Sequence, residues 1–389
     1  MKLLHTSDWH IGRSLFEFSL LEDQRDIFEK ICNIIRQEQV DALLVCGDLY
    51  DRSLPSAQAV ELLDEIFTTI NSRLHLPILA ISGNHDSARR IAYGSRLFEQ
   101  NGLYLAGGWS PELKKVTLHD QHGPVNFFLL PYFVPQQVRL GYQNPEINSA
   151  TAAFQAILEQ NREQIDPSQR NVLLAHGFFM RQSHSSAGQD EPDSPLCSGS
   201  ETSVGTSDLT DLSCADLFDY VALGHLHNPQ RAGSDWMRYS GSPLKYSVDE
   251  SNSHKSVTLV ELGEKGCLHL SEIPLKPKRD LRVISGTMEE LCDPALASDD
   301  YVFARIVSDG PVLGAMSRLR EVYPHTLGLS LSQQSAPSLS AVSEDITSLP
   351  PTELFCRFYS QVQQQELDDE QRQLVSWILD KADEESDAE

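Results

Sequence analysis

The chain of 389 residues lacks a long apolar run. A membrane-spanning helix needs about 18 consecutive apolar residues, whereas the longest apolar stretch, near Val125 to Pro135, is interrupted by polar residues and a proline. The N-terminus reaches polar Ser7 and Asp8 too early to leave the apolar core of a signal peptide. We therefore expect no membrane association and, from the length, two or three domains.

Cysteine is scarce and shows no pairing pattern. The seven cysteines are widely spaced, and no two of them form a C-x-x-C pair. We therefore expect neither a disulfide framework nor a zinc knuckle. A reducing cytoplasm fits it best.

Positive charge is also in short supply. The chain has 31 Lys and Arg against 56 Asp and Glu, a net charge of −25, which argues against a protein that holds nucleic acid by its own basic surface. Residues 281–389 alone carry 7 basic and 20 acidic side chains, and so −13 of this charge. The sequence also lacks a Gly-Lys dipeptide, which excludes a phosphate-binding P-loop.

Short apolar runs that end in polar clusters recur five times in the first 270 residues. Each run is too short for a helix and is rich in Val, Ile or Leu, which indicates buried strands. The five runs are Lys2–Thr6, Ala42–Cys46, Ile78–Ser82, Val172–Ala175 and Tyr220–Leu223.

Helical patterns lie between these runs. Residues Ser19 to Glu22 have the spacing of a capping box, and an apolar stripe of helical period follows over residues 27–35. A second helix is expected to begin at Ser56. The side chains that it should bury are Val60, Leu63, Phe67 and Ile70. Because strands and helices alternate, we predict an α/β layered fold with the polar clusters at the carboxyl ends of the strands.

Composition divides the chain into three parts. Residues 1–272 carry the alternating pattern, with a Ser- and Gly-rich surface loop expected at 183–208. A small α+β unit is predicted at 280–335, and a helical, acidic segment that we expect to bind a partner at 351–389. The elements expected in the α+β unit are strands at 281–285, 301–307 and 327–331 and a helix near 316–322.

The five polar clusters supply carboxylate oxygens, an amide oxygen and imidazoles. Oxygen and nitrogen ligands without thiolate suit Mn²⁺, Fe²⁺ or Zn²⁺ better than Ca²⁺ or a soft metal. Because strand ends meet at one edge of such folds, we expect the clusters to converge. They are Asp8-Trp9-His10, Gly47-Asp48-Leu49-Tyr50-Asp51, Gly83-Asn84-His85-Asp86, His176-Gly177 and Gly224-His225-Leu226-His227.

The order of these clusters resembles the calcineurin-like binuclear metallophosphoesterases. The patterns D-x-H, G-D-x-x-D, G-N-H-D, a lone His and G-H-x-H follow successive strands, as in that family. Three further segments closely resemble the SbcD family, the nuclease subunits of bacterial SbcCD complexes, and the similarity covers nearly the whole chain. These segments run from Leu4 to Gly12, from Ala222 to His227 and from Tyr239 to Pro243. The resemblance implies a layered sandwich with a small capping, DNA-binding domain.

The resemblance also implies two divalent metal ions, which we expect to be Mn²⁺. One ion would be bound by Asp8, His10, Asp48 and His227. The other would be bound by Asp48, Asn84, His176 and His225, so that Asp48 bridges the two. Two ions about 3.5–4 Å apart can bind a hydroxide that attacks phosphorus.

His85 is not needed as a ligand. We assign it to contact the scissile phosphate and to protonate the departing sugar oxygen, with Asp86 orienting His85 or its loop. Asp51 could cap the chain or pair with Arg52, and some relatives carry a histidine there. Four arginines near the metal loops could contact either DNA phosphate or neighbouring carboxylates; they are Arg13, Arg52, Arg89 and Arg90. The other eight histidines are expected to be structural or exposed.

The implied function is a Mn²⁺-dependent DNA nuclease in replication and recombination repair. It would act as a 3′–5′ exonuclease on duplex ends and as an endonuclease on single strands and hairpins. The SbcD family dimerises near the nuclease site and pairs with an SbcC-type ATPase, which implies two copies of each subunit on DNA in the bacterial cytoplasm. Two alternatives remain open: a phosphodiesterase or phosphatase for small molecules, since a metal site alone does not choose a substrate, and an inactive scaffold.

Overall fold

The computed structural model describes residues 1–181, 209–308 and 310–332, together with scattered residues between 352 and 379. The chain divides into two units, Met1–Ser332 and Gln333–Glu389. The surface loop predicted at 183–208 and most of the helical segment predicted at 351–389 lie outside the described residues. Among the described helices, none combines the length and the apolar composition that a bilayer span requires.

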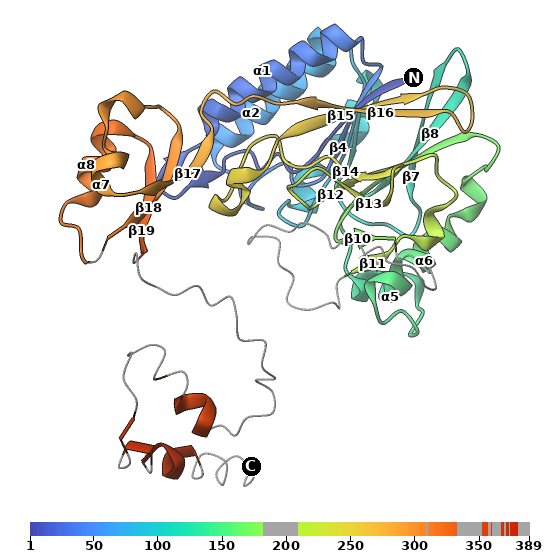
Figure 1. Cartoon of the computed structure of the whole chain (residues 1–389). Helices are drawn as coiled ribbons and strands as arrows, with labels where there is room; N and C mark the ends of the chain where they lie inside the picture. The colour runs from blue at the N-terminus through green and yellow to red at the C-terminus, as the bar shows by residue number, and fades with distance from the viewer. Residues whose placement is uncertain are drawn as a thin grey trace. The chain divides into compact units, whose positions relative to one another are not determined.

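Two six-stranded sheets form the larger part of the first unit (Figure 1). One sheet contains, in spatial order, β16 (Leu268–Pro274), β15 (Ser256–Leu262), β1 (Lys2–Thr6), β4 (Ala42–Cys46), β5 (Ile78–Ile81) and β6 (Leu103–Ala106). The other contains β13 (Gln230–Ser234), β14 (Met237–Tyr239), β12 (Tyr220–Gly224), β9 (Arg170–His176), β8 (Gly123–Leu130) and β7 (Lys114–Asp120). All five strands predicted from the sequence are present, and they pair in parallel within their own sheets.

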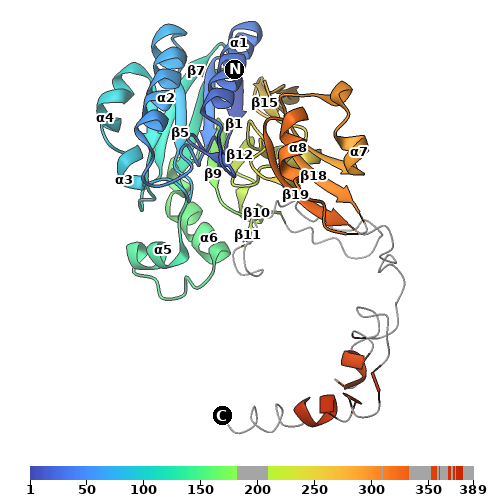
Figure 2. The same ribbon diagram turned by 90° about the vertical axis from the view of Figure 1, so that its left-hand side faces the viewer.

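Helices cover the outer faces of both sheets (Figure 2). They are α1 (Leu21–Glu38) and α2 (Ala57–Phe67) on the first sheet and α5 (Pro135–Tyr142) and α6 (Ala150–Gln160) on the second. Side chains alternate along each strand, so Leu43 and Val45 of β4 pack under the helices while Leu44 packs between the sheets. The α/β layered fold predicted from the sequence is therefore confirmed.

The helix starts agree only in part with the prediction. Ser56 caps α2 as expected, because its side chain accepts the N–H of Ala59. The capping box predicted from Ser19 is wrong, since α1 begins after Leu20 without a side-chain cap. Val60 was also wrongly predicted to be buried: α2 turns Ala59 toward the sheet and leaves Val60 45% exposed.

Shorter elements connect the layers. They are β2 (Ser14–Leu15), β3 (Phe18–Ser19), the π-helix η1 (Thr68–Arg73), α3 (Ala88–Ile91), α4 (Ser95–Phe98), η2 (Glu99–Asn101), η3 (Arg162–Gln164), β10 (Phe179–Met180), β11 (Thr210–Asp211), η5 (Ser213–Ala215) and η6 (Val248–Asn252).

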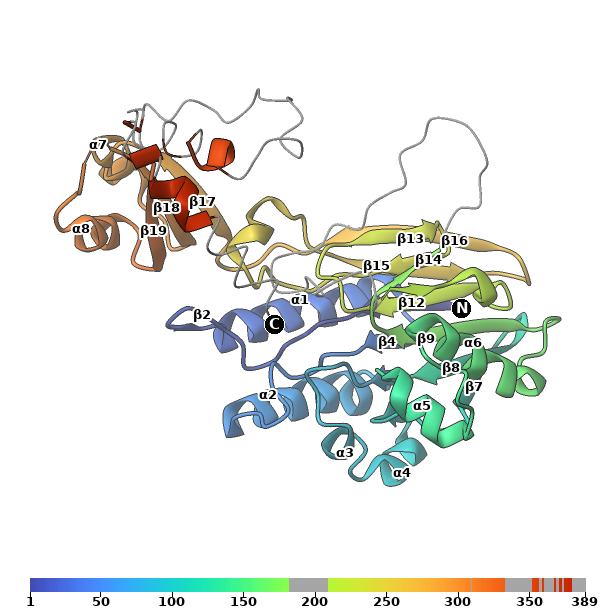
Figure 3. The same cartoon turned by 90° about the horizontal axis from the view of Figure 1, so that it is seen from below.

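A third sheet of three parallel strands and the short helices between them form a separate part with its own apolar core, which we call the cap (Figure 3). The cap consists of β17 (Leu281–Gly286), α7 (Met288–Leu291), η7 (Pro294–Leu296), β18 (Tyr301–Val307), α8 (Ala315–Val322) and β19 (Thr326–Ser332). The strands and the helix predicted for the α+β unit are present. Arg279 and the Tyr301 hydroxyl both donate to the Asp23 carboxylate of α1, at 3.0 and 2.8 Å, and so attach the cap to the sandwich. The domain boundaries at 272, 280, 335 and 351 stay predictions.

His5 of β1 links the two large sheets. Its buried ring lies 2.8 Å from the Tyr220 hydroxyl through Nδ1 and 3.2 Å from the Leu223 carbonyl oxygen through Nε2. Because a carbonyl only accepts, Nε2 carries the proton and Nδ1 accepts from the hydroxyl. Burial, partly opposed by the bond to Leu223, lowers the pKa of His5 to about 3.

We expect His5 to make the fold sensitive to acid. Below pH ~6.5 the unfolded chain protonates this histidine while the folded chain does not. The contribution of His5 to the free energy of unfolding is therefore fully present above that pH. Below it, this contribution falls by about 1.4 kcal/mol per pH unit until the pH reaches the folded pKa of about 3. The difference in unfolding free energy between the wild type and His5→Gln, measured with urea on the metal-free protein, should show this slope, because other buried histidines such as His225 contribute equally to both. The exposed His269→Gln should follow the wild type; a wild-type difference from His5→Gln that does not change with pH would contradict the prediction.

Candidate metal centre

Two adjacent loops bring the first site residues together. The backbone N–H groups of Asp8 and His10 donate to the carbonyls of Gly47 and Asp48 at 3.1 and 2.9 Å, which extends the parallel pairing of β1 and β4. Trp9 is fully buried in the core under α1. Asp8 and His10 face the second sheet instead, because Asp8 accepts the backbone N–H of His225 at 3.0 Å and Nε2 of His10 lies 3.1 Å from Nε2 of His227.

Several of these residues adopt left-handed backbone conformations. Asp8, His10, Asp48 and His225 have φ values of 52, 43, 49 and 113°. Residues other than glycine rarely occupy this region, and the strain costs on the order of 1–3 kcal/mol at each position. Four of the eight such residues in the described part of the chain are predicted metal ligands, which is the clustering expected of a functional site.

Asp48 lies at the centre of the cluster. Its Oδ2 is 3.6 Å from Nε2 of His10 and 3.5 Å from Nε2 of His176, and its Oδ1 accepts the backbone N–H of His85 at 2.9 Å. A single carboxylate oxygen thus lies between two imidazole nitrogens from different sheets. A carboxylate that is shared by two metal ions must lie in this way between the other ligands of both ions. Only glycine fits at Gly83, because a Cβ there would lie 2.1 Å from Asp48 Oδ1.

The first predicted ligand set converges around Asp8. Ligand atoms of Asp8, His10 and His227 lie within 4.8 Å of one another. The Nε2 atoms of His10 and His227 are 3.1 Å apart. Two imidazole nitrogens that face each other at this distance repel unless a proton or a cation lies between them. Leu226, between His225 and His227, is buried in the core of the second sheet.

The second set converges around Asn84. The Asn84 Oδ1 atom is 2.9 Å from Nε2 of His176 and 3.3 Å from Nδ1 of His225. His176 donates from Nδ1 to the Cys46 carbonyl at 2.9 Å, so Nε2 faces the site. Ligand atoms of His176, Asp8 and Asp48 also lie within 4.8 Å of one another. All seven side chains predicted as ligands therefore surround one space at the carboxyl ends of the strands.

Burial and mutual interaction shift the pKa values of the carboxylates and imidazoles in the cluster. Burial raises the pKa of Asp8 to about 6, although His176 and His227 lower it. Burial lowers the pKa of His225 to about 3, and the charge of His176 adds to this effect. Burial alone would lower the pKa of His176, but Asp48 and Asp8 outweigh it and raise the pKa to about 9. Divalent cations would satisfy this donor set of carboxylates, an amide and imidazoles, so the residues fit the metal ions that the fold family implies.

His85 lies beside the first ligand set. Its ring packs edge-on against His10 with the ring centroids 4.8 Å apart, and its Nδ1 is 3.0 Å from the carbonyl oxygen of Asp51. Asp86 supports the loop rather than this ring. Its carboxylate accepts three backbone N–H groups at 2.9–3.0 Å, those of Gly83, Leu49 and Tyr50. Of the two roles considered for Asp86, this geometry favours orienting the loop.

Asp51 forms ion pairs with two of the arginines left open by the sequence. Its Oδ1 is 2.9 Å from Nη1 of Arg13, and its Oδ2 is 3.3 Å from Nε of Arg52. Both arginines thus contact a neighbouring carboxylate. Arg89 and Arg90 lie on α3 and line a hollow in the surface formed by α2, η1, α3 and α4.

Residues behind the ligands were missed by the sequence analysis. Gln24 of α1 donates to the His10 carbonyl at 2.8 Å and accepts the Gly12 N–H at 3.0 Å. Its position in the apolar stripe of α1 could have identified it as buried. Glu250 lies 3.1 Å from Nδ1 of His227. Its surroundings in the sequence, Ser-Val-Asp-Glu-Ser-Asn, are typical of an exposed loop and gave no signal.

Known protein families match most of the chain. The calcineurin-like phosphoesterase family matches residues 1–229, and the type 5 capsule protein repressor C-terminal domain matches residues 277–363. The chain is 32% identical to the SbcD subunit of the nuclease SbcCD of Staphylococcus epidermidis, over 98% of this chain and 100% of that protein. It is 33% identical to the Staphylococcus saprophyticus protein of the same name, over 85% and 84%. The chain belongs to the SbcD family of calcineurin-like phosphoesterases.

A solved structure from Thermus thermophilus also matches, at 13% identity over 70% of this chain and 98% of that chain. Its TM-score of 0.38 is too low to bear on the fold. Membership of the SbcD family confirms that the chain is a metal-dependent phosphodiesterase, a hydrolase that uses divalent ions. The assignment of each ligand to an ion stays a prediction.

Gly83→Ala should weaken metal binding at this centre without unfolding the chain. The added Cβ would displace the Asp48 carboxylate, so we expect Mn²⁺ affinity to fall about 100-fold and stability by about 1–3 kcal/mol. Isothermal titration with Mn²⁺ and a circular dichroism melt measure the two effects. Gly310→Ala is the control, because a Cβ there meets no atom within 4 Å. Wild-type Mn²⁺ affinity in Gly83→Ala would contradict the prediction.

Proposed function

We propose that this chain is a Mn²⁺-dependent DNA nuclease, a 3′–5′ exonuclease on duplex ends and an endonuclease on single strands and hairpins. The observation that carries the proposal is the Asp48 carboxylate between His10 and His176, with His85 beside it. Such a centre suits a phosphodiester, whose charged oxygens and leaving group need both cations and an acid. DNA as the substrate is supported by the staphylococcal relatives, which are named as nucleases.

In this proposal the two ligand sets each bind one ion. The first is Asp8, His10, Asp48 and His227, and the second is Asp48, Asn84, His176 and His225. When bound, the ions supply Lewis acidity toward the phosphoryl oxygens and toward the attacking water. The donors mix carboxylate and amide oxygens with imidazole nitrogens and include no thiolate, which suits Mn²⁺, Fe²⁺ or Zn²⁺. Among these, Mn²⁺ is chosen because of the resemblance to the SbcD family.

His85 acts on the leaving group. Its Nδ1–H donates to the Asp51 carbonyl at 3.0 Å, which leaves Nε2 as the nitrogen that can serve the substrate. From Nε2 the ring protonates the departing sugar oxygen. Asp86 positions the loop that carries Asn84 and His85 through its three backbone hydrogen bonds. The roles of ligand, acid and loop support thus fall to different side chains.

The protein acts with an SbcC-type ATPase in this proposal. The relatives are named as one subunit of SbcCD, and the sequence has no P-loop of its own. We infer a complex with two copies of each subunit that works on DNA in the bacterial cytoplasm, in replication and recombination repair. The cap at 280–335 serves as a capping, DNA-binding domain, and the segment at 351–389 binds the partner.

A second copy of this chain fits an apolar face next to the metal loops. Helices α2, η1, α3 and α4 surround a hollow of about 790 Å³, and the lining residues Tyr93 and Phe98 are 82 and 39% exposed. Leu97, next to Phe98 on α4, is 69% exposed. Asp64 and the pair Arg89 and Arg90 also line the hollow. A patch with both signs of charge can pair with itself across a two-fold axis, which supports a homodimer through the nuclease domain.

Two substrates and two variants test the nuclease proposal. With Mn²⁺, the wild type should cut a labelled DNA hairpin and duplex far faster than bis(p-nitrophenyl) phosphate, because only DNA offers contacts beyond the scissile group. His85→Ala should bind Mn²⁺ normally yet lose about 10²–10⁴-fold in DNA cleavage. Asp48→Ala should lose Mn²⁺ binding in a calorimetric titration.

Other results would favour the alternatives. Cleavage of the small ester alone would support a small-molecule phosphodiesterase. A folded wild-type chain that takes up no Mn²⁺ would support an inactive scaffold. A full DNA cleavage rate in His85→Ala would remove the leaving-group role of that residue.

Leu97→Glu should convert the dimer to a monomer. A carboxylate buried in an apolar interface has no partner and loses its hydration, so association becomes unfavourable. Light scattering after size-exclusion chromatography reports the mass. Leu140→Glu on α5 is the matched control, because both leucines are 69% exposed. The idea fails if both variants keep the mass of the wild type.

A further inference from the structure

A buried group supports His227 from behind the metal centre. Glu250 of η6 lies 3.1 Å from Nδ1 of His227 through Oε1, and its Oε2 accepts from Lys255 at 2.6 Å. Lys255 also donates to the His227 carbonyl at 2.8 Å and to the Ser242 hydroxyl at 3.0 Å. Glu250, Lys255 and Ser242 are all buried. Both the ring and the backbone of His227 are therefore held by one group of residues.

The carboxylate determines which nitrogen of His227 faces the metal centre. An ionised carboxylate only accepts, so Nδ1 must carry the proton and Nε2 presents its lone pair. That Nε2 atom is 3.1 Å from His10 Nε2 and belongs to the cluster with Asp8. The acceptor differs from that of His176, whose Nδ1 donates to a neutral backbone carbonyl. A charged acceptor makes the opposite nitrogen a stronger metal ligand.

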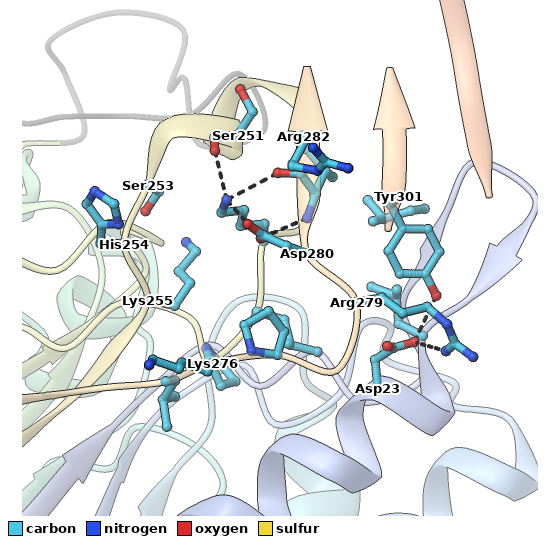
Figure 4. A pocket seen from close by; sticks show the side chains of 18 of the residues that line it. Asp23, Ser251, Ser253, His254, Lys255, Lys276, Arg279, Asp280, Arg282 and Tyr301 are labelled. Carbon is cyan, nitrogen blue, oxygen red and sulfur yellow. Dashed lines mark hydrogen bonds and ion pairs between the residues drawn. The ribbon is translucent and has the colours of Figure 1, made fainter. Parts of the chain in front are cut away.

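Glu250 lies between the metal centre and a cavity. Lys255, Ser251 and His254 line a cavity of about 830 Å³ between the sandwich and the cap (Figure 4). On the cap side, Lys245 donates to the carbonyls of Ser251 and Leu281 at 2.7 and 3.1 Å. The short helix η6 thus contacts a metal-site residue through Glu250, and Lys245 links its Ser251 to Leu281 of strand β17.

We propose that Glu250 is a positioning residue that fixes the orientation and the tautomer of His227 for metal binding, with Lys255 as its buried counter-ion. This inference rests on the proposed function, which assigns His227 as a ligand. The carboxylate contributes through both its hydrogen bond and its charge. Lys255 donates to the carboxylate at 2.6 Å and so fixes it at the distance that the imidazole requires.

A purely structural role for the ion pair is the competing explanation. Removing one partner of a buried ion pair destabilises a protein whatever the other partner touches, whereas replacing both by apolar residues of similar volume is often neutral. Loss of stability in a single variant therefore does not distinguish the two roles. A pair of double variants does, because stability can be matched while the acceptor for Nδ1 is present or absent.

The experiment compares Glu250→Leu/Lys255→Met with Glu250→Gln/Lys255→Met in the full chain. Both remove the buried ion pair, but only glutamine leaves an oxygen that can accept from Nδ1 of His227. Calorimetric titration with Mn²⁺ and a melt of the metal-free protein are the readouts. We expect the leucine variant to bind Mn²⁺ about 10–100-fold more weakly than the wild type, and the glutamine variant to recover part of this loss at a similar melting temperature.

Equal Mn²⁺ affinity in the two double variants would overturn the proposal, whether that affinity is weak or like the wild type. If the leucine variant does not fold, Glu250→Gln alone decides: it should bind Mn²⁺ about tenfold more weakly, and wild-type affinity would overturn the idea. A wild-type chain that binds no Mn²⁺ would instead refute the proposed function, so the two failures are distinguishable.

Discussion

The buried carboxylates of Asp8 and Asp48 impose the main constraint on this structure. Transfer of an ionised carboxylate out of water costs several kcal/mol unless nearby groups compensate it. Here the compensation comes from both sheets: His225 of the second sheet donates its backbone N–H to Asp8 at 3.0 Å, and His85 donates to Asp48 at 2.9 Å. The two sheets must therefore meet at their carboxyl ends, and the sandwich core between them holds those ends in register.

The same constraint explains the unusual backbone. Side chains that point into one small space from five loops require tight turns, and the left-handed conformations of Asp8, His10 and Asp48 supply them. Gly83 has no side chain where the Asp48 carboxylate must approach. These positions lower the stability of the fold, and the buried aliphatic side chains of the three surrounding cores compensate for it.

The sequence predicted what depends on local pattern. Five short apolar runs identified five of the twelve strands in the two large sheets, and the motifs that follow them identified seven side chains that the structure brings together. Partners that come from distant parts of the chain could not be predicted in this way. Glu250 contacts His227 only because η6 folds back against the loop after β12, and Gln24 contacts the His10 backbone from helix α1. The error at Val60 has a similar cause, since a stripe of helical period does not say where the buried face ends.

Net charge describes this protein less well than local charge. Of the −25, −13 lies in residues 281–389, outside the segments that carry the site residues. In salt of about 0.15 M, exposed charges more than about 8 Å away are largely screened, so a phosphate at the metal centre responds mainly to the nearest groups. Two divalent ions would outweigh the charges of Asp8 and Asp48 there. A chain with few basic residues releases few counter-ions when it binds DNA. Under the proposed function we therefore expect weak duplex binding by the chain alone and further affinity from the ATPase partner.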